Sequence, residues 1–190
     1  THMLQFKPGA DVALLNSILH VIIDEKLYNK EYIKEHTTGF EDLKNQLNSY
    51  QPEKMEKISG IKSDLIREVA RLFATTKKGI IFWGMGVSQH VHGTDNARCL
   101  ISLALMTGNV GRRGAGLHPL RGQNNVQGAS DAGLIPMMYP DYELVENNKN
   151  KNFFEKFWNT ELDPNKGLTV VEIMDAIHGD RIKGMYVLGE

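Results

Sequence analysis

The segment whose side chains are best suited to bind a ligand is Arg121–Gly128, with the sequence Arg-Gly-Gln-Asn-Asn-Val-Gln-Gly. It holds one cation, four carboxamides and a single apolar side chain, so it cannot build a hydrophobic core. Arginine presents a fixed fork of donors, carboxamides both donate and accept, and glycines let the backbone approach a ligand closely. Exposed turns of this composition are common, but the density of anion-binding groups favours a ligand-binding loop.

A second glycine-rich segment, Gly84–Gly86, follows the apolar run Gly79–Trp83, which we expect to form a fully buried parallel strand. A helix is expected soon afterwards, over residues 93–107. Glycines at a strand-to-helix turn allow close backbone approach, and the free amides of a helix N-terminus attract phosphate. The turn is not a full dinucleotide fingerprint, because Gln89 stands where the third glycine would be. A tight turn and a phosphate cradle therefore both stay open on these residues alone.

A third candidate contact lies at the entry of the first expected helix. Gly9 and Asp11 stand there, and apolar residues then recur with helical spacing over residues 11–26. Asp11 is well placed as the N-cap of that helix. It is equally well placed to contact a ligand, and both roles stay open.

Together these segments resemble the catalytic (alpha) subunit of the molybdopterin-dependent formate dehydrogenases, which use molybdenum or tungsten. The resemblance covers the chain from about Lys7 to Glu190. It departs at Ala10, where the family commonly has a threonine, so one hydroxyl contact is removed. The resemblance rests on Pro8–Asp11, Gly84–Gln89, Leu105–Gly111 and Arg121–Gly128.

The resemblance implies roles for individual residues. Arg121 matches the arginine that stands beside the metal and orients formate. A guanidinium suits this role, because it stays charged and can hold a carboxylate at two points. Gln123 is expected to pack against the pterin, and in relatives an acid in the loop of Asp11 can meet the guanine edge. The expected contacts to a pyranopterin guanine dinucleotide are Gly9, Asp11, Gly84, Met85, Gly86, Gln89 and Gln123.

The implied reaction is the oxidation of formate to carbon dioxide at a bis-molybdopterin guanine dinucleotide metal centre, with electrons passed to an acceptor subunit or domain. In the family the metal is ligated by a cysteine or selenocysteine followed by histidine, and electrons pass through a cysteine-bound iron–sulfur cluster. Neither element occurs in this sequence. We therefore expect an interior fragment that supplies no metal ligand, lacks the iron–sulfur part and is inactive alone.

Two other functions remain open. One is a stand-alone nucleotide-binding or interaction module without catalysis, which the missing metal ligands favour. The other is a different molybdopterin oxidoreductase that reduces nitrate or an oxidised sulfur or nitrogen compound. The segment Arg121–Gly128 places formate ahead of this other oxidoreductase, because it is more specific than the glycine turn.

The charge balance and the few histidines and cysteines limit the kinds of partner that we expect. With 22 basic and 23 acidic residues and a net charge of −1, the chain gives no reason to propose a nucleic-acid or membrane surface. His90 and His92 are a poor arrangement for one helical metal face, so no zinc site is expected. The single cysteine, Cys99, reads as a buried hydrophobe and excludes an internal disulfide. It fits a reducing compartment, and we expect a cytoplasmic protein.

The pattern of elements predicts an α/β fold, a Rossmann-like layered fragment of a molybdopterin oxidoreductase. Ser63 is expected to cap a helix, Thr169 and Glu172 form a capping-box pattern, and residues 147–151 read as a surface insertion. The expected helices are 11–26, 30–36, 40–49, one from Pro52, one from Ser63, 93–107, an aromatic helix near 153–158, and 169–178. The expected strands are 79–83 and 183–188.

We divide the chain into three parts. Residues 1–3 read as vector-derived, residues 4–123 as the later half of one Rossmann-like cofactor-binding domain, and residues 124–190 as the start of a segment of a second α/β domain. Gly189-Glu190 is similar to the first half of a Gly-Glu-Asn-Pro cofactor loop of the family. Sheets without all their strands would expose edges, which predicts a homodimer or strand swapping.

Overall fold

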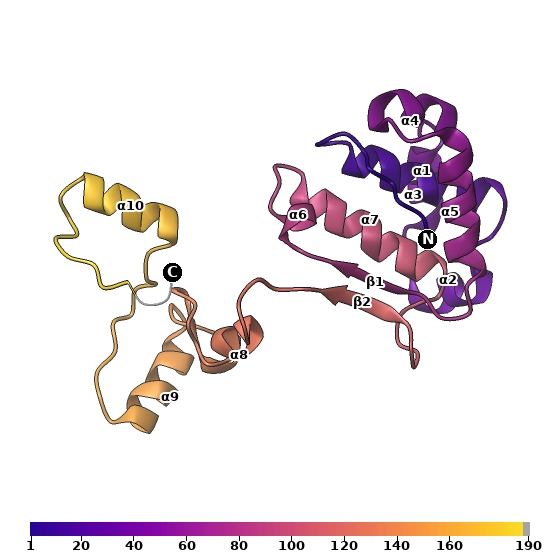
Figure 1. The fold of residues 1–190 in the computed structure, drawn as a ribbon. Helices are drawn as coiled ribbons and strands as arrows, with labels where there is room; N and C mark the ends of the chain where they lie inside the picture. Colours follow the sequence, from indigo (N-terminus) through magenta and orange to yellow (C-terminus); the bar gives the residue numbers. More distant parts are fainter. Residues whose placement is uncertain (188–190) are drawn as a thin grey trace. The chain divides into compact units, whose positions relative to one another are not determined.

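The computed structural model describes residues 1–187 and divides the chain into two compact units (Figure 1). Unit 1 is Thr1–Gly122 and unit 2 is Gln123–Glu190. Both contain helices and strands, which confirms a mixed α/β composition. Within the described residues, none of the helices is both long and apolar enough to cross a membrane.

Most of unit 1 is helical, and each helix expected there from apolar spacing is confirmed. Pro52 takes the first turn of its helix, where its missing N–H costs nothing, and Gly60 ends that helix in the left-handed conformation. The helices are α1 (Asp11–Asp24), α2 (Lys30–His36), α3 (Phe40–Leu47), α4 (Pro52–Ser59), α5 (Ser63–Thr75), the short α6 (Met85–Ser88) and α7 (Gly93–Met106).

Two expected caps are wrong. Ala10, not Asp11, is the N-cap of α1, and Lys62, not Ser63, is the N-cap of α5; neither helix has a side-chain cap. At α1 the backbone itself makes the turn, because Gly9 has a φ of 80° and the N–H of Ala10 donates to the carbonyl of Lys7. The side chain of Asp11 is therefore not needed as a cap.

The sheet of unit 1 has two parallel strands, β1 (Ile80–Trp83) and β2 (Gly116–Pro119), paired from Ile80 with Gly116 to Trp83 with Pro119. The strand expected at 79–83 is confirmed, but its full burial is wrong. Ile80 and Phe82 are 49% and 58% exposed, whereas Ile81 packs against the helical core. Successive side chains point to opposite faces of a strand, so only one face is covered.

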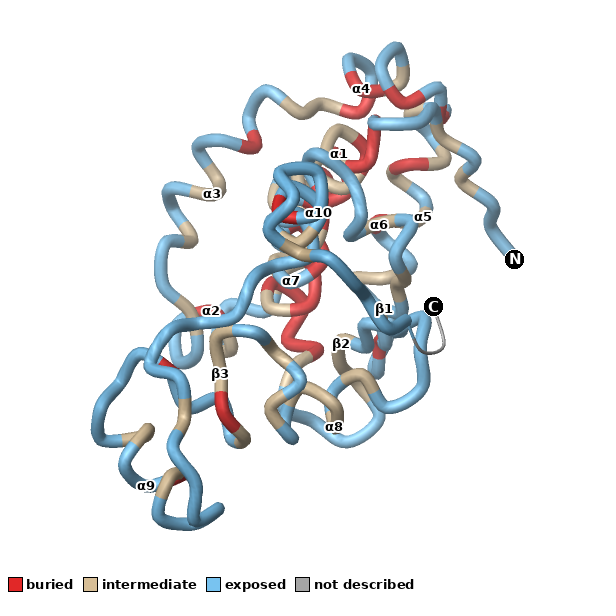
Figure 2. The backbone as a smooth tube through the Cα atoms, turned by 90° about the vertical axis from the view of Figure 1, so that its left-hand side faces the viewer, coloured by how far each residue is buried: buried red, intermediate tan, exposed pale blue. Residues whose placement is uncertain are grey.

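The hydrophobic core of unit 1 surrounds α1. Figure 2 shows buried residues along α1 and α7. Leu19 and Ile22 of α1 are fully buried and pack with Ile66 of α5 and Leu103 of α7. The helical spacing of these residues explains why the helices assemble on one shared core.

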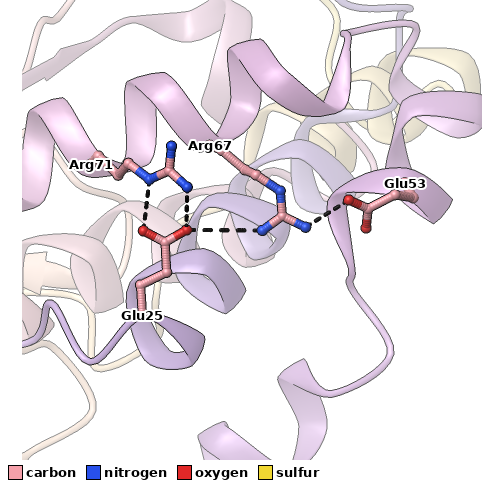
Figure 3. A network of polar contacts seen from close by, with 4 residues as sticks. All are labelled: Glu25, Glu53, Arg67 and Arg71. Atoms are coloured by element: carbon pink, nitrogen blue, oxygen red, sulfur yellow. Dashed lines mark hydrogen bonds and ion pairs between the residues drawn. The ribbon is translucent and has the colours of Figure 1, made fainter.

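An ion-pair network fastens the same helices at the surface (Figure 3). Glu25, just after α1, accepts two hydrogen bonds from Arg71 of α5, at 2.7 and 2.8 Å. Arg67, also on α5, lies 4.0 Å from Glu25 and donates to Glu53 of α4 at 2.6 Å. The hydrogen bonds from Arg71 hold the pKa of Glu25 below its ordinary value, and Arg67 does the same for the pKa of Glu53.

Unit 2 has shorter elements. Residues 147–151, expected as a surface insertion, lie at the surface, and residues 148–151 form the first turn of α9. The side chain of Asn147 accepts from the N–H of Lys149 and caps the helix. The expected aromatic helix and the capping box of Thr169 with Glu172 are confirmed. The elements are α8 (Val126–Asp131), antiparallel β3 (Met138–Tyr139) and β4 (Glu143–Leu144) joined by the 3₁₀ turn Pro140–Tyr142, α9 (Asn148–Trp158) and α10 (Val170–His178).

The strand expected at 183–188 is wrong over residues 183–187, which form no strand; Leu188 and the Gly189-Glu190 motif lie outside the described residues. Backbone groups in a strand must pair with a neighbouring strand, and none is paired with these residues. A Rossmann-like sheet contains more parallel strands than the pair β1–β2. The Rossmann-like arrangement therefore stays a prediction.

Candidate cofactor and substrate site

Two of the predicted segments meet at one edge of the sheet. Because β1 and β2 are parallel, the turn Gly84–Gly86 and the loop Leu120–Gly122 both leave the carboxyl ends of their strands. The N–H of Leu120 donates to the carbonyl of Trp83 at 2.7 Å. In parallel sheets this edge is the usual place for a ligand.

Arg121 lies at this edge with its side chain exposed. Within the described residues it makes no hydrogen bond or ion pair. The guanidinium is therefore free to hold an anion in two-point geometry. Gln123 is exposed as well and belongs to unit 2.

A cavity of about 390 Å³ is lined both by the third predicted segment and by residues that follow the glycine turn. Gly9 and Asp11 line it together with the segment His90–His92 and with Asn96. Asp11 is 7% exposed, and its carboxylate has no hydrogen-bond partner within the described residues. Gln89 is exposed at the end of α6, where its N–H donates to the carbonyl of Met85.

Asn96 lines the same cavity and is a candidate site residue that the sequence reasoning missed. It is 2% exposed, and its Nδ2 donates to the carbonyl of Val87 at 2.8 Å, which fixes the orientation of the amide. Its Oδ1 is buried and has no partner within the described residues. A buried acceptor of this kind is costly when left unpaired, and Asn96 differs from the other unpaired buried groups of the described residues in lining this cavity. No spacing in the sequence marks it.

The glycines near this turn differ in whether the surrounding atoms would tolerate a side chain. A Cβ added at Gly93 would lie 1.8 Å from the carbonyl oxygen of Ser88, so only glycine lets α7 begin against α6. A Cβ at Gly86 would meet no atom within 4 Å, and one at Gly84 would come only within 3.9 Å of the carbonyl oxygen of Leu120. Space next to Gly84 and Gly86 therefore remains open for a ligand.

The segment between the two motifs has a structural role. Asn109 is buried, and its Oδ1 accepts from the N–H of Gly79 at 3.0 Å and from Arg112 at 2.8 Å. Its Nδ2 donates to the Thr107 hydroxyl at 2.8 Å. These bonds tie the end of α7 to the start of β1, so Arg112 serves the fold.

Among the described residues no group of three His, Cys, Asp or Glu side chains could hold a metal ion. The ring of His118 packs against Phe82 at 5.3 Å. Burial, assisted by Asp95, raises the pKa of Cys99 to about 11. The thiol therefore stays protonated, and it donates to the Oδ1 of Asn16.

Comparison with known proteins identifies the family. The family model described as molybdopterin oxidoreductase matches residues 1–190. The chain belongs to the molybdopterin oxidoreductase family. Its similarity to formate dehydrogenases extends over nearly all of the sequence, as the resemblance in the motifs implied.

Two curated relatives of the molybdopterin oxidoreductase chain illustrate this similarity. The alpha subunit of the F420-dependent formate dehydrogenase of Methanocaldococcus jannaschii is 46% identical over 187 residues, which are 98% of this chain and 27% of the relative. Formate dehydrogenase H of Escherichia coli is 42% identical over 189 residues, which are 98% of this chain and 26% of the relative. The chain thus spans about a quarter of the length of these relatives.

A solved structure supports the fold. Acetylene hydratase from Pelobacter acetylenicus matches 57% of this chain and 15% of its own, with a TM-score of 0.56 and 29% identity. The described residues also fit a molybdopterin cofactor. The open space at Gly84 and Gly86 suits phosphate, and the unpaired acceptors of Asp11 and Asn96 suit the N–H groups of a pterin or guanine.

Proposed function

We propose that this chain is part of the catalytic (alpha) subunit of a formate dehydrogenase, which oxidises formate to carbon dioxide at a bis-molybdopterin guanine dinucleotide centre. The observation that carries the proposal is the meeting of an unpaired Arg121 with the glycine turn at the carboxyl ends of β1 and β2. The relatives named formate dehydrogenase support the choice of substrate.

Arg121 is the proposed catalytic residue. Its guanidinium would hold the formate carboxylate at two points and so direct the C–H bond. Formate carries one negative charge, and loss of two electrons and a proton leaves neutral carbon dioxide. The fixed cation therefore binds the substrate more strongly than the product, which favours product release. When bound, the cofactor's molybdenum or tungsten would accept the two electrons.

The cofactor would be held by backbone and side chains of several segments. The turn after β1 would approach the phosphates, Asp11 and Asn96 would accept N–H groups, and Gln89 and Gln123 would contact the pterin. The iron–sulfur cluster and the metal ligands would belong to other parts of the enzyme. The proposed contacts are Gly9, Asp11, Gly84, Met85, Gly86, Gln89, Asn96 and Gln123.

The wider assignment follows from the same proposal. Residues 4–123 would be the later half of one Rossmann-like domain and residues 124–190 the start of a segment of a second; the unit boundary after Gly122 supports this. The partners would be formate and an electron-acceptor subunit or domain in the cytoplasm. Pairing through the edges of the two-stranded sheet would give a homodimer of the chain, which light scattering would detect.

The first test is formate-dependent dye reduction by the full-length protein, wild type beside Arg121→Lys. The lysine keeps the charge but loses the two-point fork, so we expect kcat/KM to fall about 100-fold with metal content unchanged. Arg113→Lys is the matched control, because Arg113 is also exposed and unpaired within the described residues. Equal activity of Arg121→Lys and wild type would remove Arg121 from the site.

A second set of outcomes separates the alternatives. Metal-loaded wild type without formate activity would move the proposal to a nitrate or S/N-oxide reductase, which oxidation of a pre-reduced dye by nitrate or by an S- or N-oxide would detect. Wild type that carries neither metal nor pterin would favour a nucleotide-binding module. The isolated 190-residue chain is expected to retain no metal, and stoichiometric metal in it would contradict that expectation.

A further inference from the structure

One side chain connects the glycine turn to the arginine loop. A Cβ added at Gly122 would lie 2.9 Å from Cε and 3.5 Å from Sδ of Met85. The end of the Met85 side chain therefore fills the space beside Gly122. Gly122 is not in the left-handed region of φ, so the room that Met85 needs explains the glycine better than the backbone conformation does.

The direction of Arg121 depends on the backbone on either side of it. The guanidinium has no partner of its own within the described residues. The preceding Leu120 is held by its hydrogen bond to Trp83. Beside the following Gly122, the end of the half-exposed Met85 side chain occupies the place that a Cβ would take. Both constraints come from β1 and the turn after it. A small displacement of a substrate-orienting group is costly in rate.

We propose that Met85 is a positioning residue for Arg121, which braces the backbone at Gly122 and so sets the direction of the guanidinium. The inference rests on the proposed function, which gives Arg121 a substrate to orient. An unbranched thioether suits this place, because methionine adapts to irregular gaps and packs closely without a polar requirement. Met85 thus acts on the substrate through Arg121, in addition to any contact that its backbone makes with the cofactor.

The kinetic test uses the full-length holoenzyme. We expect Met85→Ala to lower kcat/KM for formate about tenfold, mainly through kcat, with metal and pterin content unchanged. Met85→Leu conserves volume and should recover most of the loss. Gly122→Ala should impair activity alone, whereas in the double variant with Met85→Ala the new methyl occupies the vacated space and restores part of it. Gly184→Ala is the matched control, since a Cβ there meets nothing within 4 Å.

The outcomes that overturn the proposal are distinct. Unchanged kcat/KM in Met85→Ala would show that Met85 does not position Arg121. The same conclusion would follow if the loss of kcat/KM in the double variant equalled the combined losses of the two single variants. Loss of pterin and metal in Met85→Ala would instead make Met85 a cofactor contact only.

A second readout does not depend on activity. With 13C-methyl methionine in the full-length protein, we expect a nuclear Overhauser effect between the Met85 methyl and Gly122 Hα, and a shift of the Arg121 amide signal in Met85→Ala but not in Met85→Leu. Absence of both would overturn the proposal even if formate is the substrate. If wild type fails to oxidise formate, the proposed function fails, and these signals still decide whether Met85 sets the loop.

Discussion

The two units differ in the size of their buried hydrophobic clusters. In unit 1, eleven buried residues from several helices form one cluster, whereas in unit 2 the described cluster contains three, Tyr139, Val145 and Phe154. A larger shared core gains more from removing apolar surface from water. Unit 1 therefore has the means to hold a site rigidly, and the candidate site residues other than Gln123 lie in it.

Unit 2 is stabilised by local helix-capping hydrogen bonds, and several of its apolar side chains are exposed. Phe153 and Phe157 of α9 are 62% and 72% exposed, and Val170 and Val171 of α10 are exposed too. Its helices are fixed by local features, namely the Asn147 cap and the capping box of α10. Unit 1 is therefore stabilised mainly by tertiary packing, whereas the described part of unit 2 has a small core and depends more on the caps of its helices.

The largest expected effect is in the core of unit 1. Ile22 is fully buried, so Ile22→Ala should cost about 2–5 kcal/mol of unfolding free energy. Urea unfolding followed by circular dichroism measures this. Ile58→Ala on α4 is the matched control, because Ile58 is half exposed and should cost far less. Equal losses in the two variants would break the claim of a shared core.

A smaller effect is expected in unit 2. Phe154→Ala removes the centre of its cluster, where Phe154 contacts the rings of Tyr139 and Trp158. The ring is buried, but the described cluster around it is much smaller than that of unit 1, so the cost should be below that of Ile22→Ala and confined to unit 2. Hydrogen exchange should show faster exchange in α9 with α1 and α5 unchanged, and Phe157→Ala should change little. Loss of protection in α5 would show that the units do not unfold separately.

The same contrast explains how much of the fold the sequence predicted. The helices of unit 1 were predictable, because their apolar residues repeat at the helical period and their ends carry turn residues. The strand β2 was not, because Gly116–Pro119 contains a glycine, a histidine and a proline and becomes a strand only by pairing with β1. The strand at 183–188 was predicted from apolar residues alone, and no partner strand pairs with residues 183–187.

The candidate site divides in a similar way. The glycine turn and the Arg121 loop were visible as unusual compositions, but their meeting required the parallel pairing of β1 with β2. Asn96 was not visible, because its meaning lies in a contact with Val87 and in an oxygen without a partner. Local patterns therefore predict which residues could bind a ligand, whereas tertiary pairing decides which of them act together.

The capping box of α10 in unit 2 should contribute less than either buried cluster. In α10 the side chain of Thr169 accepts from the N–H of Glu172, and the Glu172 carboxylate accepts from the N–H of Thr169. Thr169→Ala should cost about 1 kcal/mol of helix stability. Hydrogen exchange should then quicken in α10 alone, and Thr160→Ala should leave it unchanged. If exchange also rises in α9, unit 2 is more cooperative than its packing indicates.

The smallest effect is electrostatic and tests how unit 1 joins its helices. The pKa of Glu25 is lowered from 4.5 by its hydrogen bonds to Arg71, so its stabilisation is present above about pH 4.5 and is lost as the pH falls through the lower pKa of the folded protein. Glu25→Gln should lower the melting temperature by a few degrees at pH 7. The difference from wild type should shrink as the pH falls from about 4.5 through the lower pKa of folded Glu25, where the wild-type carboxylate also loses its charge. Glu31→Gln on α2, exposed and unpaired within the described residues, is the control. A difference that stays constant with pH would mean that Glu25 acts through packing, and the surface network would then add nothing to what the shared core supplies.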